Sequence, residues 1–138
     1  MASAYYNIGL EKFIAAASRI DLTNDTIMVR PVRTSVYTFA ATHTTMSSVT
    51  AATGTPGDGT LGTKALGTGT DGGTFDAADL TFVGWTAGAA LDALVIYKFV
   101  TNDAGSTPIA YIDGFSVVPN GGDITFVWQA TNPFIFKI

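Results

Sequence analysis

Residues 91–100, LDALVIYKFV, and residues 108–113, PIAYID, are the stretches that decide the fold of this chain. The first is a nearly unbroken apolar run, rich in β-branched and aromatic residues, which is typical of a central strand buried on both faces. The residues between them include Asn102–Gly105 (NDAG), residue types that favour a turn. The sequence therefore predicts an antiparallel hairpin at the centre of a sheet.

Strand and turn signals continue on both sides of this hairpin. Residues 123–129 alternate, with Ile124, Phe126 and Trp128 on one face and more polar residues between them. Further strands are predicted at residues 26–33, 36–39, 80–83 and 133–138, and further turns at residues 84–88 and 120–122. Because Pro31 cannot donate a ladder hydrogen bond, the strand at 26–33 is expected at a sheet edge or with a bulge.

One amphipathic helix is predicted, at about residues 7–20. Leu10, Phe13, Ile14 and Ala17 follow the helical period and would form a single apolar stripe. Asn7 is placed to cap the first turn. We expect this helix to pack across a sheet or against a neighbouring subunit.

Residues 51–73 form a Gly/Thr-rich stretch in which Leu61 and Leu66 are the large apolar side chains. This composition predicts a long loop. We expect part of the loop to pair as a weak hairpin and part to become ordered against a partner.

Composition and length indicate the fold class. The 138 residues fit one domain, 1–138. Glutamate occurs only at Glu11 and lysine is scarce, whereas threonine, glycine and β-branched residues are abundant. The sequence predicts an all-β fold, a mainly antiparallel β-sandwich or jelly-roll-like structure with one short N-terminal α-helix.

Charge and hydrophobicity limit the partners. The net charge of −4 argues against nucleic-acid binding, which needs a basic surface. Only 13% of residues are charged and 47% are hydrophobic, which indicates that a partner chain covers some apolar surface. The most apolar window, residues 80–100, contains charges and glycines, so we expect no membrane span, and residues 1–7 do not resemble a signal peptide. The absence of cysteine excludes disulfides and thiolate metal sites.

Few residues suggest chemistry. His43, the single histidine, lies in a Thr/Ser-rich stretch. It could act with a hydroxyl nucleophile, but a loop histidine making a local hydrogen bond is the favoured interpretation. The sequence contains no nucleophile-elbow motif, no P-loop, no GxGxxG after a strand and no HExxH motif, so we predict no enzyme activity and no cofactor.

The aspartates and the tryptophans each allow a functional and a structural interpretation. Four aspartates could bind calcium or cap turns: Asp76 and Asp79, spaced as in a short helical turn, and Asp58 and Asp71, in glycine-rich loops. Turn caps are favoured and no metal site is predicted. Trp85 and Trp128 could stack on sugars or lie in the core. For Trp128 the core is favoured, whereas Trp85, beside a turn, is left open.

Several segments form an ordered pattern over most of the chain. They are Tyr6–Asn7 in the N-terminal helix, Asp25–Val29, Ser35–Phe39, His43, the Gly/Thr loop, Phe75–Phe82, Ala93–Lys98, Pro108–Asp113 and Gly121–Trp128. Their order and spacing resemble those of small structural proteins of tailed-bacteriophage virions, described as capsid decoration (cement) or head-associated proteins. Arg30, Pro31 and Arg33, and the glycine-rich loop, depart from this pattern.

The resemblance implies a non-enzymatic virion protein that binds the outer capsid surface and stabilises the head. Its partners would be the major capsid protein and further copies of itself in a homo-oligomer, with a trimer favoured. It would be made in the bacterial host cytoplasm and reside on the capsid exterior. We expect Leu10, Phe13, Arg30 and Arg33 to contribute to capsid or subunit contacts. The two arginines would pair with an acidic capsid surface; the alternative is that they are ordinary solvated charges.

Other functions remain as alternatives. A tail, neck or head-fibre component with a role in host attachment is the first. A carbohydrate-binding module using Trp85 is the second, and a hydrolase using His43 ranks last.

Overall fold

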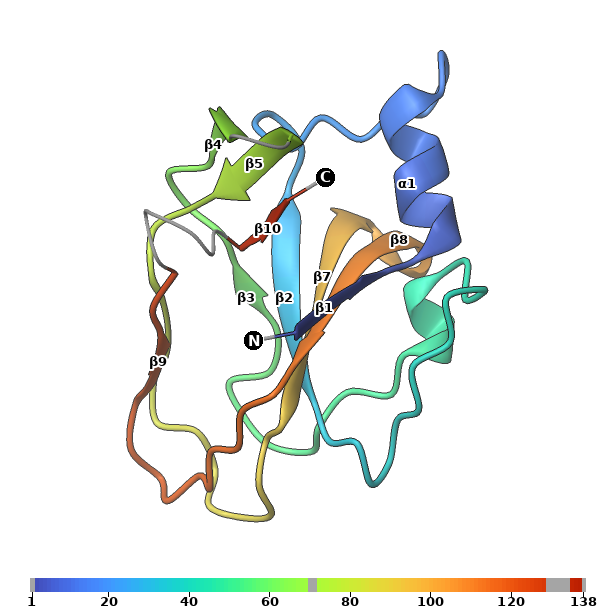
Figure 1. The fold of residues 1–138 in the computed structure, drawn as a ribbon. Helices are drawn as coiled ribbons and strands as arrows, with labels where there is room; N and C mark the ends of the chain where they lie inside the picture. Colours follow the sequence, from blue (N-terminus) through green and yellow to red (C-terminus); the bar gives the residue numbers. More distant parts are fainter. Residues whose placement is uncertain (1, 70–71, 129–134, 138) are drawn as a thin grey trace.

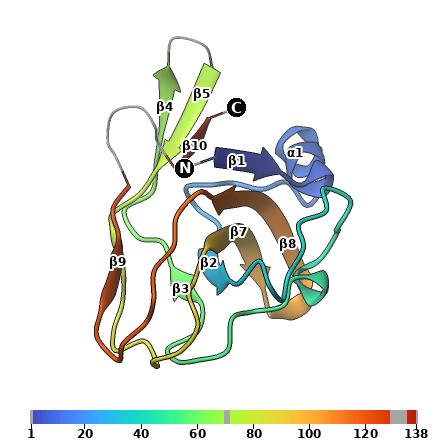
Figure 2. The ribbon, with the colours of Figure 1, turned by 60° about the horizontal axis from the view of Figure 1, so that its bottom comes forward.

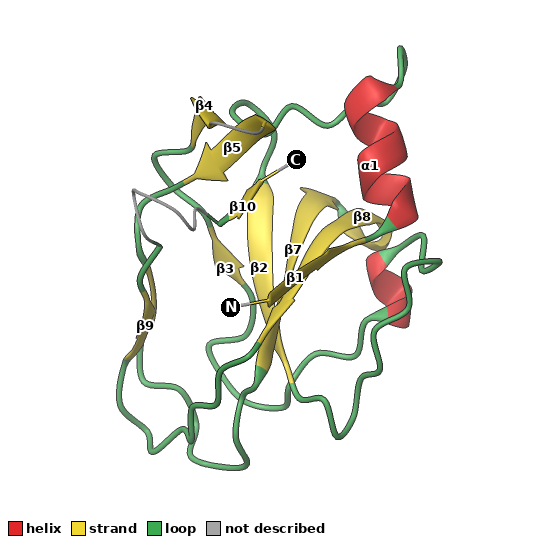
Figure 3. Cartoon of the chain, in the orientation of Figure 1, coloured by secondary structure: helices red, strands yellow, loops and turns green. Residues whose placement is uncertain are grey.

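The computed structural model describes residues 2–69, 72–128 and 135–137. Along the chain its elements are β1 (Ala2–Tyr5), α1 (Asn7–Ile14), β2 (Ile27–Val32), the short 3-10 helix η1 (Met46–Ser48), β3 (Gly59–Thr60), β4 (Ala65–Gly69), β5 (Gly72–Asp76), β6 (Leu80–Phe82), β7 (Ala93–Val100), β8 (Asn102–Asp113), β9 (Ile124–Phe126) and β10 (Phe136–Lys137). Most of the regular structure is β-strand, and α1 is the single α-helix within the described residues (Figure 3). The prediction of an all-β fold with a short N-terminal helix is confirmed.

A five-stranded antiparallel sheet forms the centre of the molecule, in the order β1-β8-β7-β2-β3 (Figure 1). β7 is its middle strand, paired with β2 from Ile27↔Lys98 to Val32↔Ala93 and with β8 on its other side. Residues 93–97 are all buried, because each face of β7 is covered by a different core. This is the doubly buried central strand and antiparallel hairpin that the sequence predicts.

Two small sheets cover one face of the central sheet. β6 pairs with β9, and β5 lies between β4 and β10 (Figure 2). The first core lies beneath them and includes Ile27, Val29, Leu94, Ile96, Phe75, Phe82, Trp85, Phe126 and Trp128. Full burial of each large apolar side chain contributes about 1.5–3 kcal/mol, so this layered packing supplies much of the driving force for folding.

The opposite face of the central sheet is covered mainly by irregular chain, whereas α1 continues from β1 alongside β8 and sends Ile8 to this face and Phe13 to the first core. The second core contains Val32, Tyr37, Met46, Val49, Val95, Tyr97 and Tyr111, together with Tyr6 just before α1. The segment from residue 33 to residue 58, which includes η1, therefore closes this face without forming a second regular sheet there (Figure 1).

Several predicted details are confirmed. Ile124, Phe126 and Trp128 are buried whereas Thr125 and Val127 are exposed, as the alternation requires. The turn at residues 120–122 has Gly121 at φ 89°, and its Gly122 N–H donates to the Asn120 side chain.

The helix prediction is wrong in length, and only part of the predicted apolar stripe is buried within the chain, through Phe13. α1 ends at Ile14, not near residue 20, and Ile14 is 87% exposed. Gly9 is the buried residue of the helix, because the backbone of α1 approaches that of β8 too closely for a side chain. Asn7 does not cap the helix, since Tyr6 holds that position without a side-chain hydrogen bond.

Strand boundaries also differ from prediction. β2 is not an edge strand, but β3 pairs with it only at Met28 and Val29. The carbonyl of Pro31 accepts from the Ala52 N–H, so the missing donor of Pro31 faces away from β7 and breaks no ladder bond there. The chain reverses at Thr101, with φ 59°, and β8 already begins at Asn102.

The remaining differences concern short segments. Residues 36–39 form no strand, and residues 77–79 form no helical turn. The Gly/Thr-rich stretch contains β3, β4 and the start of β5, with β4 and β5 paired as the expected hairpin. The final strand is β10, whereas residues 133 and 134 lie outside the described residues. In the described part of the chain no helix is both long enough and apolar enough to cross a bilayer.

Candidate functional site

Arg30 is the centre of a buried ionic cluster beneath the second core. Its guanidinium lies 2.9 Å from Asp58 and 2.7 Å from Asp103, and the side chain is 7% exposed. Nη1 also donates to the carbonyls of Met46 and Val49. β2, the chain around Asp58, η1 and the start of β8 therefore meet on one side chain.

The cluster fixes the ionisation of its members. Burial alone would lower the pKa of Arg30, but the hydrogen bonds to Asp103 and Asp58 and their charges outweigh it and raise the pKa above its ordinary value. Tyr97 donates a 2.6 Å hydrogen bond to Asp58, and burial together with that carboxylate raises the pKa of Tyr97. Arg30 also lies over the Tyr97 ring, 5.5 Å from its centroid. Each guanidinium nitrogen has at least one acceptor from elsewhere in the chain, so this cluster ties four segments together.

Arg33, three residues further on, has a different environment. Its backbone carbonyl accepts from the amides of Val36 and Tyr37, which fixes the start of the turn after β2. Nε donates to the Ala89 carbonyl at 3.1 Å, and Nη1 donates to the carbonyl and the hydroxyl of Thr53 at 3.2 and 3.1 Å. The residue is 7% exposed, but its side chain has neutral partners and forms no ion pair within the described residues.

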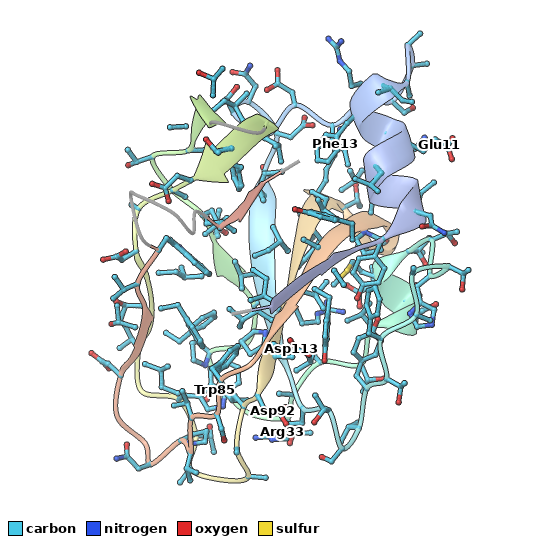
Figure 4. All side chains as sticks on the ribbon, in the orientation of Figure 1. Glu11, Phe13, Arg33, Trp85, Asp92 and Asp113 are labelled. Carbon is cyan, nitrogen blue, oxygen red and sulfur yellow. The ribbon has the colours of Figure 1, made fainter. Side chains whose placement is uncertain are left out.

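An open depression of about 410 Å³ lies against this side chain, and we call it the Arg33 depression. It is lined by Arg33, Ser35, Val36, Thr53, Gly54, Thr86, Ala87, Gly88 and Ala89. Three chain segments contribute to it: the turn after β2, the chain around Thr53, and the loop between β6 and β7. Arg33 and Asp92 lie close to each other at the end of the molecule opposite α1 (Figure 4).

Both predicted arginine contact residues are thus held inside the fold. The interpretation as ordinary solvated charges is wrong for Arg30 and Arg33, because each guanidinium has several intramolecular acceptors. The sequence did not reveal their partners Asp58, Asp103 and Thr53. Asp58 and Asp103 lie 28 and 73 residues from Arg30, so no local spacing could have indicated them.

His43 belongs to a chain of hydrogen bonds rather than to a nucleophile–base pair. The Tyr6 and Tyr37 hydroxyls lie 2.7 Å apart, and the Tyr37 hydroxyl lies 3.0 Å from His43 Nδ1. Burial raises the pKa of both tyrosines, so the phenols stay protonated at neutral pH. The prediction of a local hydrogen bond for His43 is confirmed.

The acidic residues serve different purposes from those expected. Asp79 accepts a 2.9 Å hydrogen bond from the Trp128 amide, and Asp58 pairs with Arg30 rather than capping a turn. Asp76 ends β5, and Asp71 lies outside the described residues. No group of three or more metal-ligating side chains occurs in the residues that the structure describes.

The tryptophans are core residues. Trp85 is fully buried and packs edge-on against Phe82, and Trp128 stacks with Phe126. The glycan-stacking hypothesis for Trp85 is therefore wrong, because its ring faces are covered.

Leu10 and Phe13 both lie on α1, and Phe13 is half-buried against the first core. Leu10 and Ile14 are one helical turn apart and both exposed, and Phe13 shares a groove with Leu66, which is exposed on β4. Phe13 and Glu11 leave α1 on opposite sides (Figure 4). We call Leu10, Phe13, Ile14 and Leu66 the helix surface.

No protein-family model matches the chain, and a search of curated proteins finds no similar sequence.

Proposed function

We propose that this chain is a non-enzymatic structural protein of a tailed-phage virion, a decoration protein that binds the capsid exterior and stabilises the head. The proposal combines the sequence resemblance with one structural observation, the helix surface. Its partners are the major capsid protein and further copies of the chain, assembled as a homotrimer.

The helix surface carries the argument because it leaves large apolar side chains in water. An amphipathic helix normally turns such residues toward its own core. α1 instead packs through Gly9 and Phe13 and presents Leu10 and Ile14 outward, on the helix that also lines the groove of Phe13 and Leu66. Covering such a surface contributes about 25 cal/mol per Å² of apolar area, summed over many copies on a shell.

The first test is the copy number of this chain in purified virions relative to the major capsid protein. We expect one copy per capsid subunit or a simple fraction of it. A few copies per particle would instead support the tail, neck or head-fibre alternative with a role in host attachment. Absence from virions would overturn the proposal.

The second test concerns the contact surface. Ile14→Lys combined with Leu66→Lys should release the chain from virions at salt concentrations that the unchanged chain withstands. Val83→Lys combined with Val127→Lys is the matched control, since these exposed valines adjoin β6 and β9. Equal release by both pairs would show that the helix surface is not the contact.

A further inference from the structure

Arg33 carries a buried charge that the described chain does not neutralise. Of its guanidinium nitrogens, Nε and Nη1 donate to Ala89 and Thr53. Nη2 has no hydrogen-bond partner in the described residues, and it is not completely buried, so solvent can reach it. Because Arg33 lines the depression, this nitrogen has access to a ligand there.

Arg30 is the nearest structural counterpart of Arg33, and the comparison shows that Arg33 lacks a carboxylate partner. Arg30 has the same degree of burial, and its charge is matched by Asp58 and Asp103. Asp92, near Arg33, directs its two oxygens to the amide and hydroxyl of Thr34, at 2.8 and 2.6 Å. A buried guanidinium with neutral acceptors retains a strong preference for a carboxylate.

We propose that the Arg33 depression binds a side-chain carboxylate, aspartate or glutamate, presented by a partner protein. The carboxylate accepts hydrogen bonds from Nη2 of Arg33 and from the exposed Ser35 hydroxyl on the rim. The carbon chain that carries it packs against Val36, Ala87 and Ala89. The inference rests on the proposed function only in taking the partner to be a virion protein.

The surroundings favour a protein carboxylate over a polyanion. Arg33 is the one basic residue that lines the depression, and the chain has a net charge of −4, which repels nucleic acid. Val36 is exposed at the rim and provides apolar contact that an inorganic anion cannot use. The volume of about 410 Å³ lies in the range of ligand-binding pockets.

The test is a titration of the isotope-labelled full chain with a tetraglutamate peptide, followed by NMR. We expect saturable shifts of the Arg33 side-chain Nε–H signal and of the Thr86 and Gly88 amides, and none with tetraglutamine. Arg33→Gln should weaken binding about tenfold, because one charge-assisted hydrogen bond is lost. Lys12→Gln removes the same charge on α1 and should leave the affinity unchanged.

Three outcomes would overturn the proposal. They are equal shifts with tetraglutamine, unchanged affinity of Arg33→Gln, and shifts with inorganic phosphate as large as those with the peptide. If Arg33→Gln does not fold, Val36→Asp replaces it. That variant keeps every hydrogen bond of Arg33 and places a competing carboxylate at the rim, so unweakened peptide binding would equally contradict the proposal.

Virion binding separates this inference from the proposed function. If the unchanged chain is present in virions but Val36→Asp is retained as well as Val127→Asp, the same change at an exposed valine next to β9, the carboxylate site is wrong and the decoration function stands. If the unchanged chain is absent from virions, the decoration function fails, whereas the peptide titration still decides the site.

Discussion

Arg30 shows how a single buried charge can organise this protein. Its side chain joins β2 to residues far along the chain, and both of its carboxylate partners depend on it to different degrees. The Asp58 side chain is 16% exposed and the Asp103 side chain is 49% exposed. Water can therefore solvate Asp103 in place of the guanidinium, but it reaches Asp58 poorly.

Replacing Arg30 should be costly. Arg30→Met keeps the volume but leaves Asp58 buried without its ion pair, and we expect the free energy of unfolding to fall by about 3 kcal/mol. Asp103→Asn removes the more exposed partner and should cost about 1 kcal/mol or less. Urea denaturation of the variants measures both values. A loss for Arg30→Met as small as that for Asp103→Asn would show that the cluster is not a stabilising centre.

Asp21 contributes a pH dependence. Hydrogen bonds from the side chains of Asn24 and Thr23, and from the Asn24 amide, lower the pKa of Asp21 well below its ordinary value. A lowered folded-state pKa stabilises the protein above the unfolded-state pKa of about 3.9. That contribution is lost as the pH falls through the folded-state pKa.

Asp21→Asn should therefore be less stable than the unchanged chain at neutral pH. The difference in urea midpoint should shrink as the pH is lowered below about 4. Urea midpoints of both proteins across this range provide the measurement. A difference that stays constant with pH would mean that the Asp21 carboxylate is not the cause.

At the scale of elements, α1 depends on a close approach of two backbones. A Cβ at Gly9 would lie 2.8 Å from the Ile109 Cα and from the Pro108 carbonyl oxygen. Gly9→Ala should push α1 away from β8 and lower the free energy of unfolding by about 1–3 kcal/mol. Gly73→Ala on β5 is the control, since nothing lies within 4 Å of the added atom. Calorimetry of both variants tests this, and equal stability would contradict the close approach.

The same helix shows where sequence patterns succeed and fail. The hairpin of β7 and β8 was predictable because its apolar runs are local and their burial follows directly. The apolar period in residues 7–20 was misleading, because it predicts contacts from large side chains only. The close contact with β8 is instead made by Gly9, which has no side chain. β1 was not predicted, since its sequence ASAY has small residues and gains its strand structure from pairing with β8.

The candidate sites were predictable only in part. The local hydrogen bond of His43 followed from its polar surroundings. The difference between Arg30 and Arg33 did not, because it depends on carboxylates that tertiary folding brings to one of them. Trp85 beside a turn signal gave no indication that the turn folds back over the core.

At the scale of the whole molecule, the protection of backbone amides against hydrogen exchange should differ between regions. β7 has hydrogen-bonded neighbours on both sides and a core on each face, so its amides should exchange with solvent at rates close to those of global unfolding. The β4–β5 hairpin, with exposed Leu66, should exchange faster. Hydrogen exchange measured residue by residue tests this order. Comparable rates in the two regions would show that the layers unfold as one unit.

The position of β1 also sets an order of events during synthesis. Ala2 pairs with Asp113 and Tyr5 with Ala110, so β1 has no partner until nearly all of β8 has been translated. α1, which packs on Ile109, waits for the same stretch. β1 and α1 are therefore synthesised well before the strand that they contact, and the apolar side chains of α1 stay exposed in the nascent chain until β8 has been made.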